Sequence, residues 1–144
     1  MRYGTDRTAS VAPSESEQGE TGLREWLESF ARAVREQDYV RGRSLFTPNV
    51  IAFGTRGTEL HGIEALVADQ WRPVWGTTRG FTFDLNHARI VVAGDTAWAT
   101  IPWRSQGRRS DGAWFDRLGR ATYILERRDG CWLAVHSHHS LNPA

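Results

Sequence analysis

The second half of the chain constrains the fold most, because it consists of long runs rich in β-branched and aromatic residues. Four such runs cover about residues 81–92, 96–106, 113–128 and 131–140. They are separated by Gly94-Asp95, Asp111-Gly112 and Asp129-Gly130, and such residue pairs are strong turn signals between antiparallel strands. The pattern predicts four strands joined by consecutive hairpins.

The first half has a helical pattern. Apolar residues recur at the spacing of one helix face between an N-cap at Thr21 and about Gln37, which predicts an amphipathic helix. These residues are Leu23, Trp26, Leu27, Phe30 and Val34. Asp38 is expected to cap a second, shorter helix that runs to Phe46 and stops at Thr47-Pro48-Asn49.

A strand pair and a third helix are expected next. Val50 to Phe53 reads as a strand, and a turn leads to a short segment over Thr58 to His61. Apolar residues from Ile63 to Trp71 predict the third helix, which Pro73 ends or kinks. Helices followed by a long meander predict an α+β domain with the helices packed on one face of the sheet.

Residues 1–20 are rich in Ser, Thr, Glu and Gly and offer little to bury, which predicts a disordered tail before one domain over residues 21–144. No apolar run approaches the roughly 20 residues that cross a bilayer, so no membrane partner is expected. The opening residues have no apolar segment typical of a secretory signal, and the protein is therefore expected to be cytoplasmic.

The charged residues exclude several kinds of chemistry. The net charge is +1, and all 18 basic residues are arginine, which excludes a lysine Schiff base and a P-loop lysine. Basic and acidic residues are interleaved, so no nucleic-acid partner is expected. The single Cys131 cannot form an internal disulfide and is predicted to be a buried, inert thiol.

Two stretches resemble the nuclear transport factor 2-like (NTF2-like) superfamily, which includes ketosteroid isomerase, SnoaL-type polyketide cyclases, scytalone dehydratase and the association domain of calcium/calmodulin-dependent kinase. Residues 127–140, followed by Pro143, are similar to the final hairpin of that association domain and of many SnoaL-like proteins. Ile90 to Arg104 is similar to the hairpin before it. The resemblance covers about residues 21–143 and implies a cone-shaped α+β barrel, with three N-terminal helices on a strongly curved, mixed, mostly antiparallel sheet.

The resemblance also implies which side chains face the inside of the cone. Alternate residues of a strand face opposite sides, and by analogy Val135, Ser137 and His139 are expected inside. His136 and His138 then lie on the outer face, where relatives pair as dimers.

The same comparison places two further polar groups in the pocket. Tyr123 falls where isomerases hold a protonated carboxylic acid, and Arg104 falls where the kinase domain has a pocket arginine. The expected pocket walls are Phe30, Phe53, Trp71, Trp75 and Trp98, with His61 near the mouth. Gly54 and Phe30 stand near the positions of the isomerase base and tyrosine, which argues against steroid isomerase chemistry by that mechanism.

Each polar candidate has an ordinary structural alternative. His139 could act as a general acid or base or only hydrogen-bond at a strand end. Arg104 could bind a carboxylate or form a salt bridge to Asp84 or Asp116. Tyr123 could stabilise an oxyanion or sit in the core, and His61 could be a surface residue. The histidines at 136, 138 and 139 could share a metal or form a polar dimer interface, and no metal is expected because no cysteine pair or HExxH motif accompanies them.

Two functions remain open at this point. The first is a cofactor-independent enzyme of the polyketide cyclase, dehydratase or isomerase kind, acting by acid-base chemistry on a small apolar carbonyl compound. His139 would move a proton while Tyr123 and Arg104 stabilise the oxyanion. The second is a non-catalytic, dimeric module that binds a small carboxylate ligand or serves in assembly. Both predict a small organic partner and a homodimer.

Overall fold

The computed structural model describes residues 12–144, and its elements follow the predicted order. The helical elements are α2 (Glu15–Glu36), α3 (Tyr39–Ser44), α4 (Ile63–Leu66), a π-helical segment (Val67–Trp71), α5 (Arg72–Trp75) and a 3-10 turn (Leu85–His87). The strands are β1 (Phe46–Phe53), β2 (Leu60–His61), β3 (Thr78–Phe83), β4 (Arg89–Ala93), β5 (Thr96–Arg108), β6 (Trp114–Arg128) and β7 (Cys131–Leu141).

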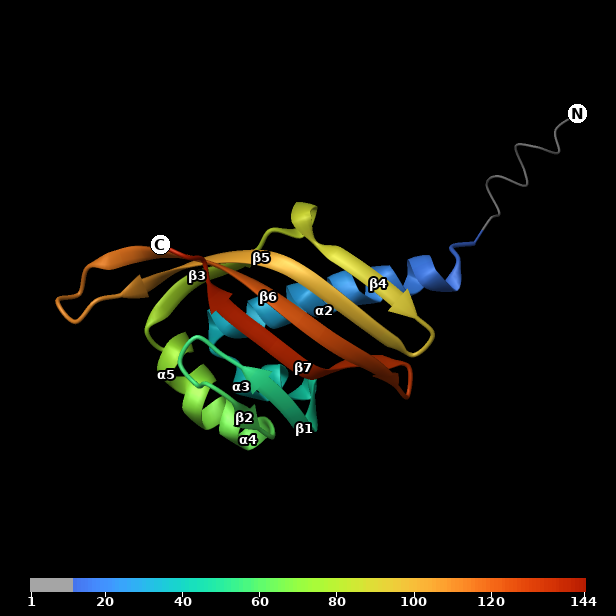
Figure 1. Ribbon diagram of the computed structural model, residues 1–144, viewed down its shortest axis with the longest axis horizontal. Coiled ribbons are helices and arrows are strands. Elements are labelled where there is room, and N and C mark those ends of the chain that lie inside the picture. The colour runs from blue at the N-terminus through green and yellow to red at the C-terminus, as the bar shows by residue number, and fades with distance from the viewer. Residues whose placement is uncertain (1–11) are drawn as a thin grey trace, which may run out of the picture.

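The seven strands form one sheet in the order β2-β1-β7-β6-β5-β3, and β4 also pairs with β5. β1 runs parallel to β7, whereas the other pairs are antiparallel. Figure 1 shows α2 running behind the curved sheet, with α4 and α5 beside β1 and β2. The chain therefore has the predicted α+β fold, with helices packed on a mixed, mostly antiparallel curved sheet.

Helix α2 packs against the sheet, mainly on β3 and β4, and against α3. Its predicted apolar face is buried, including Trp26 and Phe30. The helix begins at Glu15, earlier than the expected cap at Thr21, because the Ser14 hydroxyl accepts a hydrogen bond from the Glu17 N–H at 3.1 Å. Residues 15–20 are therefore helical and not part of a disordered tail, and residues 1–11 lie outside the described residues.

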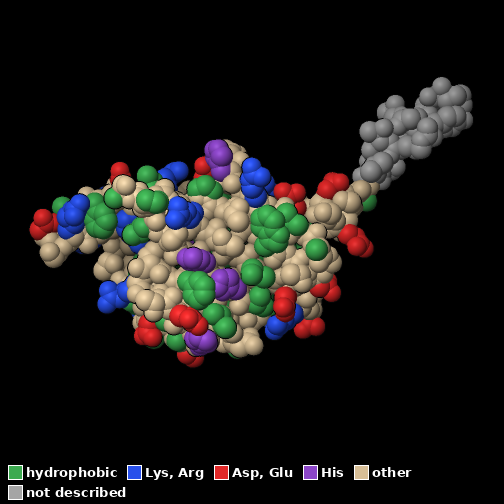
Figure 2. All heavy atoms as spheres, viewed as in Figure 1, with side chains coloured by type: hydrophobic (Ala, Val, Ile, Leu, Met, Phe, Trp, Pro, Cys, Tyr) green, Lys and Arg blue, Asp and Glu red, His purple; other side chains and the backbone are tan. Residues whose placement is uncertain are grey.

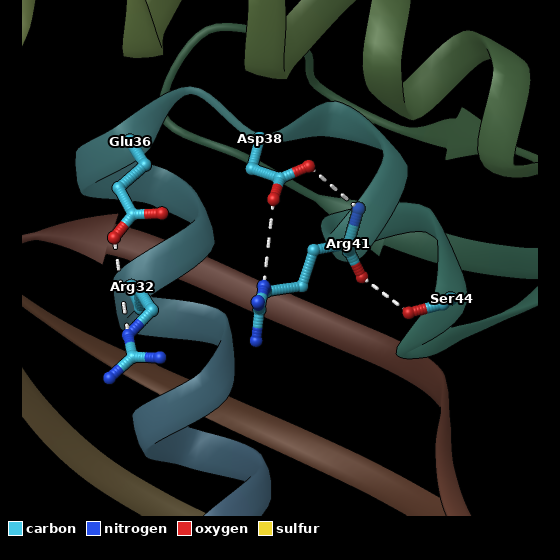
Figure 3. Close-up of polar contacts among 5 residues, drawn as sticks. All are labelled: Arg32, Glu36, Asp38, Arg41 and Ser44. Carbon is cyan, nitrogen blue, oxygen red and sulfur yellow. Dashed lines mark hydrogen bonds and ion pairs between the residues drawn. The ribbon is translucent and has the colours of Figure 1, made fainter.

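The junction of α2 and α3 is held by local polar contacts (Figure 3). Asp38 caps α3 as predicted, accepting a hydrogen bond from the Arg41 N–H at 3.0 Å. The Asp38 carboxylate also lies 3.5 Å from the Arg41 guanidinium, and the Ser44 hydroxyl donates to the Arg41 carbonyl at 2.6 Å. Helix α3 ends at Ser44, and β1 begins at Phe46, earlier than the expected Val50. These contacts fix the turn that directs β1 into the sheet.

The third predicted helix continues past Pro73 to Trp75. Proline lacks the N–H that an α-helix needs and its ring crowds the preceding turn. Here the preceding turn is widened into a π-helix, in which the Arg72 N–H bonds to the Val67 carbonyl. The wider turn accommodates Pro73, so Trp71 and Trp75 lie on one continuous helical stretch.

The predicted strand over residues 81–92 is two strands in the structure. β3 pairs with the second half of β5, β4 pairs with its first half, and the 3-10 turn Leu85–His87 separates them. Asp84 begins this turn: its carboxylate contacts His87 Nδ1 at 2.7 Å, and its N–H bonds to the Pro102 carbonyl at 3.0 Å. The other three predicted strands and their turns match β5, β6 and β7 closely.

Strand β7 contains a β-bulge that changes which side chains face inward. Ile124 pairs with His136, but the next residue of β6, Leu125, pairs with Ala134, so Val135 is left without a partner. Ala134 and Ser137 are therefore both buried, whereas Val135 is only half-buried. The expected inward position of Val135 is wrong, because strict alternation does not hold across a bulge. Cys131 is exposed, contrary to the expected burial, since it directly follows the Asp129-Gly130 turn.

Candidate functional site

A pocket lies between α2, the helical stretch 66–75 and the inner face of the sheet. Aromatic rings make up much of its wall: Phe30, Trp71, Trp75, Phe81 and Trp103. Its polar lining residues include Thr55, Gln70, Arg117, Ser137 and His139. An aromatic wall with a few convergent polar groups is the usual composition of a small-molecule site.

The rings pack against one another and leave limited free space. Phe30 lies 5.7 Å from Trp71 and 5.9 Å from Trp75 between ring centroids, and the two tryptophans stack at 4.6 Å. The pocket and its opening to solvent together hold about 540 Å³ of empty space. The cavity volume that water can occupy is only about 40 Å³. That is room for about three waters, so the enclosed part admits only a small group.

Tyr123 and His139 form a hydrogen-bonded pair at the pocket wall. The Tyr123 hydroxyl contacts Nε2 of His139, and the two rings are edge to face with centroids 5.4 Å apart. Tyr123 is completely buried, whereas His139 is half-buried and lines the pocket. The pair therefore links the core to the pocket.

The environment of this pair determines the protonation state of each residue. Burial raises the pKa of Tyr123 well above its usual value, so the phenol stays protonated. Burial lowers the pKa of His139 to about 3, aided by electrostatic interaction with His138 and with the Arg117 guanidinium, so the imidazole is neutral at pH 7.

The tautomer follows from these protonation states. Within residues 12–144 the buried Tyr123 hydroxyl has Nε2 as its one hydrogen-bond partner, so the hydroxyl donates and Nε2 accepts. The imidazole proton of His139 is consequently on Nδ1, which has no protein partner among these residues. Nδ1–H is therefore a free donor on a residue that lines the pocket.

Arg117 on β6 is the cation of the pocket. Its guanidinium donates to the Ser105 hydroxyl at 3.1 Å and lies 5.3 Å from the Trp103 ring centroid. No carboxylate within residues 12–144 pairs with it, and burial lowers the pKa of its guanidinium. A partly buried charge without a counterion favours an anionic group in the pocket.

Gln70 fixes the loop at the pocket edge. Its Oε1 accepts hydrogen bonds from the N–H groups of Arg56 and Gly57 at 2.9 and 2.8 Å, and its Nε2 donates to the Thr55 hydroxyl at 3.0 Å. A Cβ atom at Gly54 would lie 2.4 Å from Gln70 Oε1, so any other residue there would push the Gln70 amide out of these hydrogen bonds. Gln70 thereby positions Thr55 beside Arg117.

Several predicted site residues do line the pocket. Phe30, Trp71, Trp75, Ser137 and His139 are among its walls, and Tyr123 lies behind His139. Phe53 borders the pocket, but its ring packs against the rings of His136 and His138 at 4.9 and 5.3 Å.

Besides Val135, three predicted pocket residues lie elsewhere. Arg104 is exposed on the outer face of β5, because the inward residues of that strand are Trp103 and Ser105. Trp98 is on the same outer face and is 42% exposed. His61 is exposed and bonds to Glu59 at 2.7 Å, so its surface alternative is the correct one.

Arg117 was missed by sequence reasoning although a signal was available. Tyr123 and Arg117 are six positions apart on one strand, so both face the same side. In addition, Arg104 pairs with Leu118 and Ser105 pairs with Arg117, and directly opposed residues share a face. The assignment of Tyr123 to the inside therefore implies that Arg117, and not Arg104, is the pocket arginine.

The other two histidines of the cluster do not line the pocket. His138 is exposed, and His136 Nδ1 contacts the Ile51 carbonyl at 2.7 Å. Within residues 12–144, no group of three or more His, Cys, Asp or Glu side chains is arranged to hold a metal ion.

The helices, the curved sheet and the enclosed pocket define the class of protein: an NTF2-like α+β domain with one aromatic-walled hollow. An NTF2-like superfamily protein from Salmonella enterica serovar Typhimurium has 22% sequence identity and a TM-score of 0.73, over 85% of this chain and 89% of that one. A proposed dehydratase of the NTF2-like family from Streptomyces avermitilis has 19% identity and a TM-score of 0.77, over 90% and 99%. The association domain of C. elegans CaMKII has 15% identity and a TM-score of 0.68, over 89% and 99%. At these identities the likeness shows the fold.

The family is more specific than the fold. A family model described as a SnoaL-like domain matches residues 23–144, so the chain belongs to the SnoaL-like domain family. The predicted resemblance to the superfamily is confirmed. Among curated proteins, none matches the chain.

One further prediction concerns the membrane. The helices between residues 12 and 144 are all too short or too polar to span a bilayer. The cytoplasmic location stays a prediction.

Proposed function

We propose that the chain is a cofactor-independent enzyme of the cyclase, dehydratase or isomerase kind, and that it acts on a small, mostly apolar carbonyl compound. The observation that carries this proposal is the presence of two donors in one aromatic pocket, the Nδ1–H of His139 and the guanidinium of Arg117. Donors placed before the reaction where negative charge develops are the main source of catalysis at a carbonyl group. The family of the chain and the proposed dehydratase with the same fold support this class of reaction.

The proposed mechanism assigns each residue a role. The substrate carbonyl accepts a hydrogen bond from His139 Nδ1–H. A water molecule in the pocket takes the proton from the adjacent carbon, and Arg117 balances the negative charge that develops on the oxygen of the resulting enolate. Tyr123 holds the imidazole in the required tautomer, so we treat it as a positioning residue. A neutral imidazole can act as such a donor. With a pKa of about 3, however, His139 is a weak base, so oxyanion stabilisation fits better than the expected proton shuttle.

A second candidate is a binding module for a small carboxylate ligand. No Asp or Glu among the described residues lines the pocket, so no carboxylate base is placed to remove a proton from carbon. The same two donors bind a carboxylate without any reaction. This observation favours capture over turnover.

The enzyme and the binding module can be distinguished by incubating the protein with a panel of small carbonyl compounds and carboxylates. Mass spectrometry then shows whether a new product forms. A new product from the wild type supports the enzyme, and His139→Phe, which removes the donor and keeps the aromatic volume, should slow it by about 10² to 10³. Arg104→Gln is the matched control, because Arg104 is exposed outside the pocket. Unchanged turnover in His139→Phe would rule out the mechanism, and binding without product would favour the module.

We also propose that two copies pair through the outer face of the sheet. Figure 2 shows histidines and hydrophobic side chains next to one another on this face. Its exposed apolar residues include Ile51, Trp98 and Ile124, and His138 lies close by on β7. Exposed apolar groups gathered on one face are typical of an interface.

The test is the mass of the protein in solution. Ile124→Arg is expected to convert a dimer to a monomer in light scattering, because a charge would be buried without a partner. Val40→Arg, on the exposed side of α3, should leave the dimer intact. A monomeric wild type would contradict this proposal and leave the proposed chemistry unaffected.

A further inference from the structure

Four polar groups of the pocket wall have a hydrogen to donate to a ligand. Two of them are the guanidinium of Arg117 and the Nδ1–H of His139. Ser137 is only 4% exposed and lines the pocket, and its hydroxyl has no hydrogen-bond partner within residues 12–144. The Thr55 hydroxyl accepts from Gln70 at 3.0 Å and lies 3.5 Å from the Arg117 guanidinium, which leaves its own hydrogen unused.

The same wall has few groups that can accept a hydrogen bond. No Asp or Glu among residues 12–144 lines the pocket. Gln70 Oε1 already accepts from two backbone N–H groups, and Nε2 of His139 accepts from the Tyr123 hydroxyl. Because the donors include the unbalanced cation Arg117, the wall selects a ligand that is rich in oxygen and carries a negative charge.

The guanidinium and the imidazole lie beside the same aromatic ring. The Arg117 guanidinium lies 5.3 Å from the Trp103 ring centroid, and the ring centroids of Trp103 and His139 are 6.0 Å apart. The charge of Arg117 is also close enough to His139 to contribute to the lowered pKa of the imidazole. Ser137 is two positions from His139 on β7, past the bulge, so both side chains lie on the inner face. One small ligand can therefore contact several of these donors at once.

The free volume limits this ligand to a few atoms. The cavity volume that water can occupy is about 40 Å³, which is room for about three waters. Three waters take up about 90 Å³ in the liquid, roughly the volume of a molecule with five or six non-hydrogen atoms. The rest of the wall includes the rings of Phe30, Trp71 and Phe81, so the part of the ligand away from the donors is short and apolar.

We infer that the pocket binds a short 2-oxo acid, a molecule of about three carbons with a carbonyl group next to a carboxylate. Arg117 and Thr55 bind the carboxylate, because a guanidinium matches its geometry and charge. His139 Nδ1–H and the Ser137 hydroxyl donate to the carbonyl oxygen, and a methyl group contacts the aromatic wall. This inference rests on the proposed function for the role of the carbonyl group, and it narrows the substrate to one chemical class.

NMR titrations with four probes test this inference. Pyruvate has both groups, propionate lacks the ketone, acetone lacks the carboxylate, and phenylpyruvate adds a ring that exceeds the free space. Pyruvate should bind at least about tenfold more tightly than each of the other three probes. Ser137→Ala should weaken pyruvate binding by about threefold to tenfold, the effect of one lost hydrogen bond, and leave propionate binding unchanged. Arg104→Gln is the control, because Arg104 is exposed outside the pocket.

The outcomes separate this inference from the proposed function. The inference is overturned if pyruvate binds no more tightly than propionate or acetone, if phenylpyruvate binds as well as pyruvate, or if Ser137→Ala binds pyruvate like the wild type. Exchange of the pyruvate methyl hydrogens for deuterium in heavy water, faster with the protein than without it, measures the enolisation that the proposed function requires. Selective pyruvate binding without faster exchange would support the 2-oxo acid site and contradict the proposed chemistry. Turnover of another carbonyl compound that depends on His139, without pyruvate binding, would support the proposed function and overturn this inference.

Discussion

Arg117 on β6 lies directly opposite Ser105 on β5 and donates a hydrogen bond to its hydroxyl at 3.1 Å. This is a neutral partner for a charged group that is partly removed from water. Among residues 12–144, no carboxylate balances this cation in the aromatic pocket.

Replacing Arg117 by an uncharged residue should change the stability of the protein and its binding of carboxylates in opposite directions. Arg117→Met keeps the stem and removes the charge, so we expect the free energy of unfolding to rise by about 1 kcal/mol, because an unbalanced charge leaves the interior. Binding of small carboxylates should fall in the same variant. Denaturant unfolding and calorimetry measure the two effects, with Arg104→Met as the exposed control. A marked loss of stability would show that the guanidinium is better paired than its contacts indicate.

Tyr123→Phe should allow His139 to adopt both neutral tautomers. The hydroxyl is the donor to Nε2, and without it the proton can occupy either nitrogen. Nitrogen NMR of the imidazole is expected to show a proton on Nδ1 in the wild type and a mixture in the variant. The unpaired buried nitrogen should also cost about 1–3 kcal/mol of stability. A wild-type proton on Nε2 would contradict the assigned donor role.

Acidification should destabilise the protein through His139. The pKa of His139 is about 3 in the folded state and near 6.5 when unfolded, so the unfolded chain binds the extra proton. The stabilising effect is complete above about pH 6.5 and declines as the pH falls toward 3. Between about pH 6 and 5 the expected loss is roughly 1.4 kcal/mol per pH unit.

Denaturant unfolding at several pH values measures this slope. His139→Phe has no proton to bind at this position, so its stability should depend less on pH in that range. Equal slopes in the variant and the wild type would place the imidazole in contact with bulk water.

Gly54→Ala should loosen the edge of the pocket. Its Cβ would meet Gln70 Oε1 at 2.4 Å, which forces the amide away from the N–H groups of Arg56 and Gly57. We expect a loss of about 1–3 kcal/mol and faster hydrogen exchange at these two amides. Adding Gln70→Ala should relieve the clash, so the double variant should lose less than the sum of the two single variants. Strict additivity would mean that the two residues do not interact.

The sequence determined the elements whose signals are local. The spacing of Leu23, Trp26 and Phe30 predicts α2, and the Asp38 cap predicts the start of α3, because helix periodicity and capping depend on residues a few positions apart. The turn pairs at 94–95 and 129–130 mark two hairpins for the same reason, and the resemblance of residues 127–140 to a known final hairpin indicates the superfamily.

Only the tertiary structure decided which side chains enter the pocket. A shift of one position moves every side chain of a strand to the other face, which is why Arg104 lies outside and Arg117 inside. The bulge at Val135 reverses the alternation within one strand, and strand partners, not neighbours in sequence, set its position. The empty space beside Arg117 and the lowered pKa of His139 depend on rings from α2, β3 and β5 that meet only after folding. The direction and the burial of these side chains result from packing between residues far apart in the sequence. They are therefore set by the sequence but cannot be recognised in its local patterns.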